Sequence, residues 1–430
     1  MTKINEHSEG MCRTWIIHPH VTRVTEISLR TQESKLEEII NLAKAINLDV
    51  VEKDIVNIKE VQSATYIGSG KVKDCEAIID VMKIDLVIMD CSLTPIQQRN
   101  LETKLGCKVI DRTALIIEIF GERASTKEGK LQVELAALEY QKSRLVRSWT
   151  HLERQRGGHG VMGGPGERQI ESDRRMLDNR IVKIKKSIEE VKKTRSLHRK
   201  SRKKVPYPIV ALVGYTNSGK STLFNRLTGA DVFAKDLLFA TLDPTMREVI
   251  LPSHRKIILS DTVGFISDLP TELIVAFRAT LEEVVEADLI LHVRDIECPD
   301  TKAQKIDVIK ILESLLSADQ IENSMIEVLN KIDLVDEEVR ERLRHKKTKS
   351  ISISAITGEN MDELSNLIDE FFLAKQVDID LLVPISDGKQ IAWIYDHGEN
   401  IVVSPEDKFM RINGKISQKD YSRFEKMFSD

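Results

Sequence analysis

The spacing of two glycines, a lysine and a serine in one segment could bind phosphate. Ile209–Val213 predicts a buried strand, and Thr222–Leu227 predicts the helix that follows. Between them lies the pattern G-x-x-x-x-G-K-S, which comprises Gly214, Tyr215, Thr216, Asn217, Ser218, Gly219, Lys220 and Ser221. The backbone N–H groups of such a loop turn toward phosphates, and the helix adds the positive end of its dipole. We expect Lys220 to contact the β- and γ-phosphates of a nucleotide and the Ser221 hydroxyl to bind Mg²⁺.

Two other segments could respond to the γ-phosphate. One comprises Asp261, Thr262, Val263 and Gly264, after the predicted strand Lys256–Leu259. A carboxylate there can hold Mg²⁺ through water, and the Gly264 N–H can contact the γ-phosphate. The other comprises Phe239, Ala240, Thr241, Leu242 and Asp243. We predict that Thr241 completes the magnesium coordination only when the γ-phosphate is present.

Two motifs near the end of this region could select the base. The first comprises Asn330, Lys331, Ile332 and Asp333, and the second comprises Ser354, Ala355 and Ile356; each follows a predicted strand. The Asp333 carboxylate can accept both N–H donors on the Watson–Crick edge of guanine, whereas adenine offers no such pair. The aliphatic part of Lys331 can lie on the base, and the second motif can supply a backbone N–H to guanine O6.

The five motifs together predict a site that binds GTP with Mg²⁺ and hydrolyses the GTP. The predicted metal ligands are Ser221 and Thr241, and the predicted catalytic residues are Lys220, Thr241 and Gly264. Phe265 stands where many GTPases have a glutamine that orients the attacking water, and phenylalanine cannot hydrogen-bond to water. A local realignment that brings a polar group there is the alternative. We therefore expect slow hydrolysis by the isolated protein and faster hydrolysis with a partner.

A second lysine-containing loop is a weaker candidate. Gly68-Ser69-Gly70-Lys71 lacks the earlier glycine of the phosphate-binding pattern, and Val72 replaces the magnesium-binding hydroxyl. A turn that leads into a helix is the favoured interpretation, and a second nucleotide site there stays an alternative.

The elements that must position these motifs form two α/β regions. Residues 205–376 alternate strand and helix patterns and predict a doubly wound P-loop GTPase domain. Residues 1–122 show the same alternation and predict a small α/β domain with a parallel sheet. Its expected helices are Leu36–Ala45 and Thr94–Leu105, and its expected strands are Leu86–Met89 and Val109–Ile110.

Residues 123–204 predict a basic helical hairpin. Leucines and β-branched residues recur at steps of three and four, as in paired coiled-coil helices. The first row comprises Leu131, Leu135, Leu138, Leu145 and Leu152, and the second comprises Leu177, Ile181, Ile184, Ile188 and Val191. Gly157–Gly166 contains six glycines and a proline, which cannot continue a helix and predict a glycine-rich tip.

Charge is distributed very unevenly along the chain. Tyr140–Lys204 carries 20 Lys and Arg against 7 Asp and Glu, a net of +13, so a whole-chain charge of −4 leaves −17 elsewhere. Such a local excess of positive charge favours contact with a polyanion. A solvated helix face would show the same composition and is the alternative. Residues 377–430 predict a small α+β domain with strands near Leu382–Ile385, Gln390–Tyr395 and Glu399–Val403 and a helix from Gln418.

Composition argues against a secreted or membrane-spanning protein. The longest apolar runs are too short to cross a bilayer, and the first residues lack the apolar stretch of a signal peptide. The five cysteines are scattered without a Cys-x-x-Cys pair, which argues against a disulfide framework or a zinc site. We expect a cytoplasmic protein, with peripheral membrane association as a further possibility.

The chain resembles the HflX family of ribosome-associated GTPases over nearly its whole length. In the nucleotide domain the resemblance lies in FATLDPT (Phe239–Thr245) and DTVGFI (Asp261–Ile266). The more specific strings lie outside it. They are YIGSGKV (Tyr66–Val72), LTPIQQRNLE (Leu93–Glu102), IDRTALIIEIF (Ile110–Phe120), EGKLQVELAALEY (Glu128–Tyr140), HLERQRGGHGVMGGPGERQIESDRR (His151–Arg175) and SDGKQIAWIYDHGE (Ser386–Glu399).

This resemblance implies a GTPase that binds the large ribosomal subunit, with the hairpin reaching ribosomal RNA, and that promotes the separation of stalled ribosomes. A monomer is expected. Two alternatives stay open: an ATP-dependent RNA remodeller or helicase that uses the N-terminal domain, and a GTP switch whose hairpin binds a protein or membrane surface. A KH-type RNA module at the C-terminus is excluded because Val377–Asp430 contains no G-x-x-G.

Overall fold

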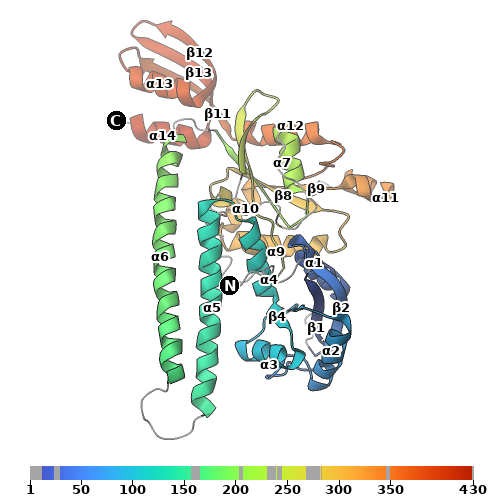
Figure 1. Ribbon diagram of the computed structural model, residues 1–430. Coiled ribbons are helices and arrows are strands. Elements are labelled where there is room, and N and C mark those ends of the chain that lie inside the picture. Colours follow the sequence, from blue (N-terminus) through green and yellow to red (C-terminus); the bar gives the residue numbers. More distant parts are fainter. Residues whose placement is uncertain are drawn as a thin grey trace.

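The computed structural model describes residues 12–23, 30–155, 165–202, 207–229, 239, 245–267, 281, 283–344 and 349–428. Four units follow one another along the chain (Figure 1). An N-terminal α/β unit lies beside the first helix of a long helical hairpin, and the nucleotide domain lies between this unit and a small C-terminal unit. In the described part of the chain, none of the helices combines the length and apolar character that crossing a bilayer requires.

The N-terminal unit is built on a four-stranded parallel sheet with the order β2-β1-β3-β4. Its elements are β1 (Arg13–Val21), α1 (Gln32–Ala45), β2 (Asp49–Ile58), α2 (Ser69–Met82), β3 (Leu86–Met89), α3 (Pro95–Leu105), β4 (Lys108–Asp111) and α4 (Arg112–Arg123). On β1, Ile16 belongs to one apolar core while Trp15 and Ile17 belong to another. Both faces of the sheet are therefore covered, as a parallel sheet requires.

Local signals explain why its helices begin where they do. The Thr94 side chain accepts a hydrogen bond from the Gln97 N–H, and the Gln97 side chain accepts one from the Thr94 N–H, which is a capping box before Pro95. Thr31 caps α1 in a similar way by accepting from the Ser34 N–H. The helices and strands predicted for this region are confirmed, although α1 begins four residues earlier than predicted, at Gln32.

The hairpin consists of α5 (Lys127–Gln155) and α6 (Pro165–Arg202). Its helices pack through Leu135, Ile181, Ile184 and Ile188, with Leu131 and Leu138 partly buried beside them, so these members of the two predicted apolar rows face each other. Pro165 and Gly166, predicted as part of the tip, instead open α6, because proline suits the first helical turn. The rest of the predicted tip, 157–164, lies outside the described residues.

The nucleotide domain has a six-stranded sheet with the order β10-β9-β8-β5-β7-β6, in which only the edge strand β6 is antiparallel. Its strands are β5 (Ile209–Gly214), β6 (Thr245–Ile250), β7 (Lys256–Asp261), β8 (Leu289–Asp295), β9 (Met325–Asn330) and β10 (Ser350–Ser352). Its helices are α7 (Lys220–Thr228), α9 (Thr301–Glu313), α10 (Ala318–Ser324), the 3₁₀ turn η1 (Ile332–Leu334), α11 (Glu337–Arg344) and α12 (Met361–Leu373). The predicted α/β GTPase fold is confirmed.

The C-terminal unit corrects one sequence prediction. It contains β11 (Gln376–Pro384), α13 (Gly388–His397), β12 (Gly398–Glu406), β13 (Phe409–Ser417) and α14 (Gln418–Phe428), with the antiparallel order β11-β13-β12. Gln390–Tyr395, predicted as a strand, is helical because Asp387 accepts a hydrogen bond from the Gln390 N–H and caps the helix. The third strand is β13, which the sequence prediction missed. Its Ile412 and Ile416 are buried in the core with Ile394 of the new helix.

Candidate nucleotide-binding site

The phosphate-binding loop lies where the sequence places it, between β5 and α7 at the carboxyl end of the sheet. Two of its glycines are needed for close approach. A Cβ on Gly214 would lie 2.1 Å from the carbonyl oxygen of Val293, and one on Gly219, where φ is +90°, would lie 2.1 Å from Asn330 Nδ2. Glycine is therefore required at both positions, because the loop backbone packs closely against the ends of β8 and β9.

Lys220 is buried at the first position of α7. Its Nζ donates a hydrogen bond of 2.8 Å to the carbonyl oxygen of Tyr215. Burial lowers the pKa of Lys220 to about 8, and the nearby Asp261 carboxylate only partly opposes this. A buried ammonium group with few partners is suited to bind an anion, which would satisfy its remaining donors.

Two of the groups predicted to lie near a magnesium ion, Ser221 and Asp261, are in contact. The Ser221 hydroxyl donates a 2.7 Å hydrogen bond to Asp261 Oδ2, so both oxygens lie at the same edge of the loop. Hydroxyl and carboxylate oxygens are the ligands that Mg²⁺ prefers, and the pair therefore fits the predicted ion. Thr241, with Ala240, Leu242 and Asp243, lies outside the described residues, whereas Phe239 is buried.

The base-selecting motifs are joined to the phosphate loop by one side chain. Asn330 Nδ2 donates to the carbonyl oxygen of Ser218 at 2.9 Å, and its Oδ1 accepts from the Ala355 N–H at 3.0 Å. Asn330 thus bridges three of the predicted motifs. The Ala355 N–H is thus used inside the protein, and the backbone N–H that the Ser354–Ile356 motif would offer to guanine O6 stays a prediction.

Two buried side-chain oxygens in the site could each accept a hydrogen bond from a ligand. Asp333 Oδ1 and Ser218 Oγ are shielded from solvent and form no hydrogen bond with any described residue. Leaving a buried polar atom unsatisfied is unfavourable by about 1–3 kcal/mol, so such an atom favours a ligand that supplies a donor. Guanine offers N–H donors of the kind that Asp333 needs. Lys331 of the same motif as Asp333 forms an ion pair of 2.7 Å with Asp295 Oδ2, and this contact holds the Lys331 side chain in place.

The segment that follows Asp261 lies on the phosphate loop as an extension of β7. The Phe265 N–H donates to the Gly214 carbonyl oxygen at 3.1 Å, and the Thr216 N–H donates to the Phe265 carbonyl oxygen at 2.8 Å. Thr262 and Val263 are buried beside it, and so is the Phe265 side chain. The side chain that replaces the water-orienting glutamine therefore belongs to the apolar core in this structure.

The weaker loop in the N-terminal unit forms the start of α2, as the favoured interpretation predicts. Gly68 is the residue before the helix, and Lys71 forms an ion pair of 3.1 Å with Asp54. An open cavity of about 400 Å³ is lined by this loop and by the end of β2. The Lys71 ammonium group is already neutralised, which disfavours the interpretation as a phosphate loop.

A P-loop GTPase is the class of protein that this fold and site define. Family models match in three parts: "GTP-binding GTPase N-terminal" at 33–121, "GTP-binding GTPase Middle Region" at 123–202 and "50S ribosome-binding GTPase" at 209–331. The chain is 47% identical to the GTPase HflX of Magnetococcus marinus, covering 87% of this chain and 86% of that one. It is 42% identical to the GTPase HflX of Caldanaerobacter subterraneus subsp. tengcongensis, covering 92% and 90%. The chain belongs to the HflX family of GTPases.

A solved structure, that of a GTP-binding protein from Sulfolobus solfataricus in complex with GDP, is 26% identical. The similarity covers 84% of this chain and 98% of that one, with a TM-score of 0.45. Membership of the family makes this chain an enzyme that hydrolyses GTP.

Proposed function

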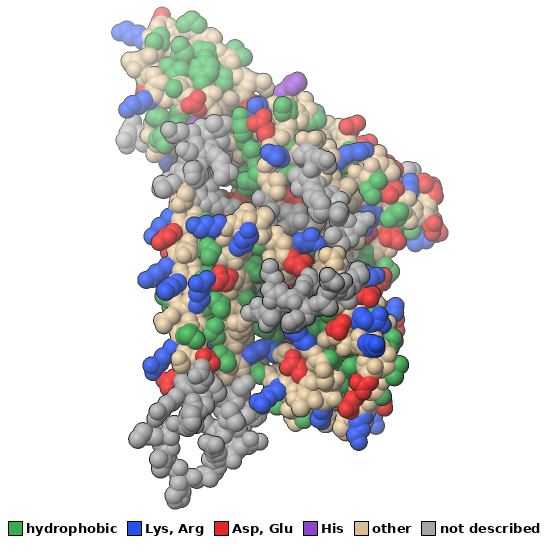
Figure 2. Space-filling model, viewed as in Figure 1, with side chains coloured by type: hydrophobic (Ala, Val, Ile, Leu, Met, Phe, Trp, Pro, Cys, Tyr) green, Lys and Arg blue, Asp and Glu red, His purple; other side chains and the backbone are tan. Residues whose placement is uncertain are grey.

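We propose that this GTPase binds the large ribosomal subunit through the α5–α6 hairpin and promotes the separation of stalled ribosomes. The observation that carries the proposal is the basic excess on a hairpin that extends beside the body of the protein (Figure 2). On α6, Lys183 and Lys186 are exposed and form no ion pair with any described residue. Exposed cations on one long arm suit the phosphates of RNA.

Side-chain contacts join the base of the hairpin to the N-terminal unit. Tyr140 on α5 donates a 2.7 Å hydrogen bond to Asp111 Oδ1, and Arg144 contacts Asp111 Oδ2 at 2.6 Å. Asp111 is buried at the end of β4, and its side chain also caps α4. These contacts join the base of the hairpin to the N-terminal unit, which supports a role in which RNA binding is transmitted to the nucleotide domain.

Within the nucleotide site, the proposed roles follow the predicted motifs. Lys220 and the Gly264 N–H would bind the γ-phosphate, Asp333 would bind guanine, and Ser221 with Thr241 would hold Mg²⁺. The bound ion would neutralise charge on the phosphates. Since Phe265 cannot orient water, we propose that hydrolysis is slow in the isolated protein and is stimulated by the ribosome. We also propose a monomer that acts in the cytoplasm.

Co-sedimentation with isolated large subunits tests the ribosomal role. We expect binding with a non-hydrolysable GTP analogue to exceed binding with GDP, and to weaken steeply as salt rises. Lys183→Glu combined with Lys186→Glu should reduce binding at least tenfold, because each change reverses a cation near RNA. Lys73→Glu on the exposed face of α2 is the matched control and should bind as the wild type does.

Three results would contradict the proposal. They are binding that is insensitive to salt, binding that is equal for the double hairpin variant and the control, or hydrolysis that is fast without ribosomes. ATP turnover that persists in Lys220→Ala would favour the RNA-remodelling alternative instead.

A further inference from the structure

The carboxylate of Asp295 contacts the motif that is predicted to bind the base. Asp295 is the last residue of β8, and strand pairing places it opposite Asn330, the last residue of β9. Just beyond this pair, the Ile296 N–H donates to the Asn330 carbonyl oxygen at 3.2 Å. The ends of two neighbouring parallel strands therefore bring Asp295 into contact with Lys331, which follows Asn330 in the chain.

Both oxygens of this carboxylate have partners. Oδ2 forms the ion pair of 2.7 Å with the Lys331 ammonium group, and Oδ1 accepts a hydrogen bond of 3.1 Å from the Glu297 N–H. The two side chains of the ion pair are largely shielded from solvent, with 12% of Asp295 and 18% of Lys331 exposed. A charge-assisted contact is stronger than a neutral hydrogen bond, so it restricts a side chain that is long and flexible by nature.

The backbone of Lys331 has an uncommon conformation that its neighbours fix. Its φ is +69°, in the left-handed region that residues other than glycine seldom adopt. On one side the Asn330 side chain bridges two other motifs, and on the other side the Ile332 N–H donates to the Ile353 carbonyl oxygen at 3.2 Å. Such conformations persist where the surrounding structure holds them, and they are frequent at ligand sites. The backbone and Asp295 together therefore set the direction of the Lys331 side chain.

The ion pair determines which part of Lys331 is available to a base. Because Asp295 binds the ammonium end, the apolar methylene stem is the part that is left to contact a ligand. Asp333, two residues further on, has the buried Oδ1 that forms no hydrogen bond with any described residue. The motif thus offers a hydrogen-bond acceptor for the edge of a base and an apolar stem for its face.

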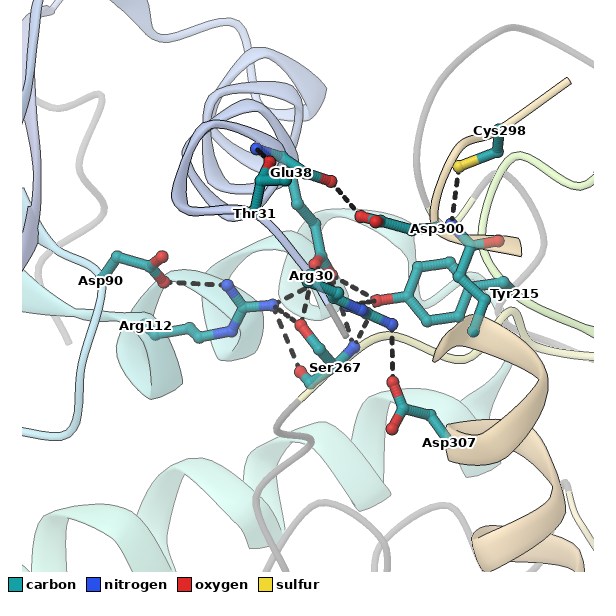
Figure 3. Close-up of polar contacts among 12 residues, drawn as sticks. Arg30, Thr31, Glu38, Asp90, Arg112, Tyr215, Ser267, Cys298, Asp300 and Asp307 are labelled. Carbon is teal, nitrogen blue, oxygen red and sulfur yellow. Dashed lines mark hydrogen bonds and ion pairs between the residues drawn. The ribbon is translucent and has the colours of Figure 1, made fainter. Parts of the chain in front are cut away.

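The loop that begins after Asp295 is fixed at its other end as well. Asp300 is buried and accepts a hydrogen bond from the Ser34 hydroxyl of α1, the helix that it faces in Figure 3. Further along the chain, Asp307 of α9 contacts Arg30 at 2.6 Å (Figure 3). These contacts with the N-terminal unit hold the loop in place, so the position of Asp295 does not depend on a bound nucleotide.

We propose that Asp295 is a positioning residue for guanine binding, which holds the Lys331 side chain so that its methylene stem forms the surface on which the base lies. This proposal rests on the proposed binding of guanine by Asp333 and on the predicted contact of Lys331 with the base. Asp333 binds the edge of the base and selects guanine. Asp295 acts through Lys331 on the face of the base, so it raises the affinity without changing the selection. A side chain that is already fixed costs less to order when the ligand binds.

Affinities of full-length variants for GDP and for inosine diphosphate, measured without ribosomes, test this role. Hypoxanthine keeps the ring faces and the N1–H of guanine but lacks its 2-amino group. Asp295→Asn, which keeps an oxygen for the Glu297 N–H, should weaken the binding of both nucleotides roughly fivefold, the cost of ordering one long side chain. Asp333→Asn should weaken GDP binding more than inosine diphosphate binding, because only guanine offers the carboxylate a second donor. Glu297→Gln, exposed on the same loop, is the control and should bind both nucleotides as the wild type does.

A double-mutant cycle shows whether Asp295 acts through Lys331. Lys331→Met removes the ammonium group and keeps an unbranched chain, so it should weaken the binding of both nucleotides about as much as Asp295→Asn does. Combining the two changes should add no further loss, because either one breaks the same ion pair.

Three results would overturn the role of Asp295. They are additive losses in the cycle, a changed ratio of GDP affinity to inosine diphosphate affinity in Asp295→Asn, and an unchanged affinity in either single variant that melts like the wild type. An unchanged ratio in Asp333→Asn would instead contradict the proposed guanine contact, while the cycle with Lys331 would still decide the role of Asp295. Failure of the ribosomal role would leave these results unaffected, because no ribosome is present.

Discussion

His18 belongs to a polar cluster of the N-terminal unit that reaches Arg112 through Asp90. Its Nδ1 contacts Asp90 Oδ2 at 2.7 Å and its Nε2 contacts Gln32 Oε1 at 2.8 Å, while Asp90 also binds Arg112. Burial lowers the pKa of His18, but the hydrogen bonds to Asp90 and Gln32 outweigh burial and leave this pKa above its ordinary value. Lys35 acts weakly in the opposite direction. A single histidine therefore links proton binding to the stability of the contacts around Asp90 and Arg112.

This raised pKa predicts a pH-dependent contribution to stability. The contribution is fully present below about pH 6.5, the unfolded value, and is lost as pH rises through the higher folded pKa. His18→Gln should therefore reduce the free energy of unfolding more at pH 6 than at pH 8.5. Urea unfolding at the two values measures the difference. His20→Gln, on the same strand but outside the Asp90 cluster, is the control substitution, and an equal loss for His18→Gln at both pH values would contradict the prediction.

At the scale of elements, the hairpin depends on a narrow apolar seam. The two helices are long, yet their shared core is a small cluster that includes Ile184, which is 3% exposed. Ion pairs such as Arg180–Glu134 and Lys185–Glu139 line the exposed sides of the seam. Exposed pairs contribute little, so the apolar seam is what keeps the helices together.

Ile184→Ala should weaken the hairpin by about 2–5 kcal/mol, because it removes buried methyl groups and leaves a cavity. We expect faster hydrogen exchange along α6 and weaker binding to large subunits, with GDP affinity unchanged. Val182→Ala is a matched control, since Val182 is 53% exposed on the same helix. A loss of GDP affinity in Ile184→Ala, or equal effects of the two substitutions, would contradict this account.

At the scale of the whole molecule, the C-terminal unit contacts the nucleotide domain at the turn between β6 and β7, residues 251–255. Arg255 in this turn contacts Glu399 of the C-terminal unit through two hydrogen bonds of 3.0 and 2.7 Å. Ser253 of the same turn binds Asp369 on α12. The turn thus connects the C-terminal unit to strands that lead directly to the nucleotide-sensing segments.

Arg255→Ala should loosen this attachment by about 1–3 kcal/mol, the value of hydrogen bonds to charged groups. The measurable result is faster proteolysis around residues 374–376, while the fold of each unit is retained. Arg411→Ala serves as the control because Arg411 pairs with Asp380 inside the C-terminal sheet. Equal proteolysis of the wild type and Arg255→Ala would show that other contacts hold the unit.

The sequence alone was sufficient for features that depend on local spacing. The phosphate loop follows from glycines, a lysine and a serine between a strand and a helix, and the hairpin follows from apolar residues at steps of three and four. Such patterns fix which backbone groups and which faces are available, so they can be interpreted without knowing the rest of the fold. Local composition gave the wrong prediction in two places where a helix-starting signal outweighs it: Pro165 and Gly166 open α6, and Gln390–Tyr395 is helical. Gln390–Tyr395 is rich in strand-forming residues, but a capping aspartate makes it helical.

Contacts between distant parts of the chain were decided by the tertiary structure. Glu38 and Ser267 are separated by 229 positions, and nothing in either segment indicates that they meet. Their carboxylate and hydroxyl groups come together only because α1 and the end of the Gly264 segment are packed on one apolar core. In the sequence, a charged residue on an amphipathic helix cannot be distinguished from a solvated one. Packing removes the water around Glu38, and the loss of water strengthens its hydrogen bonds.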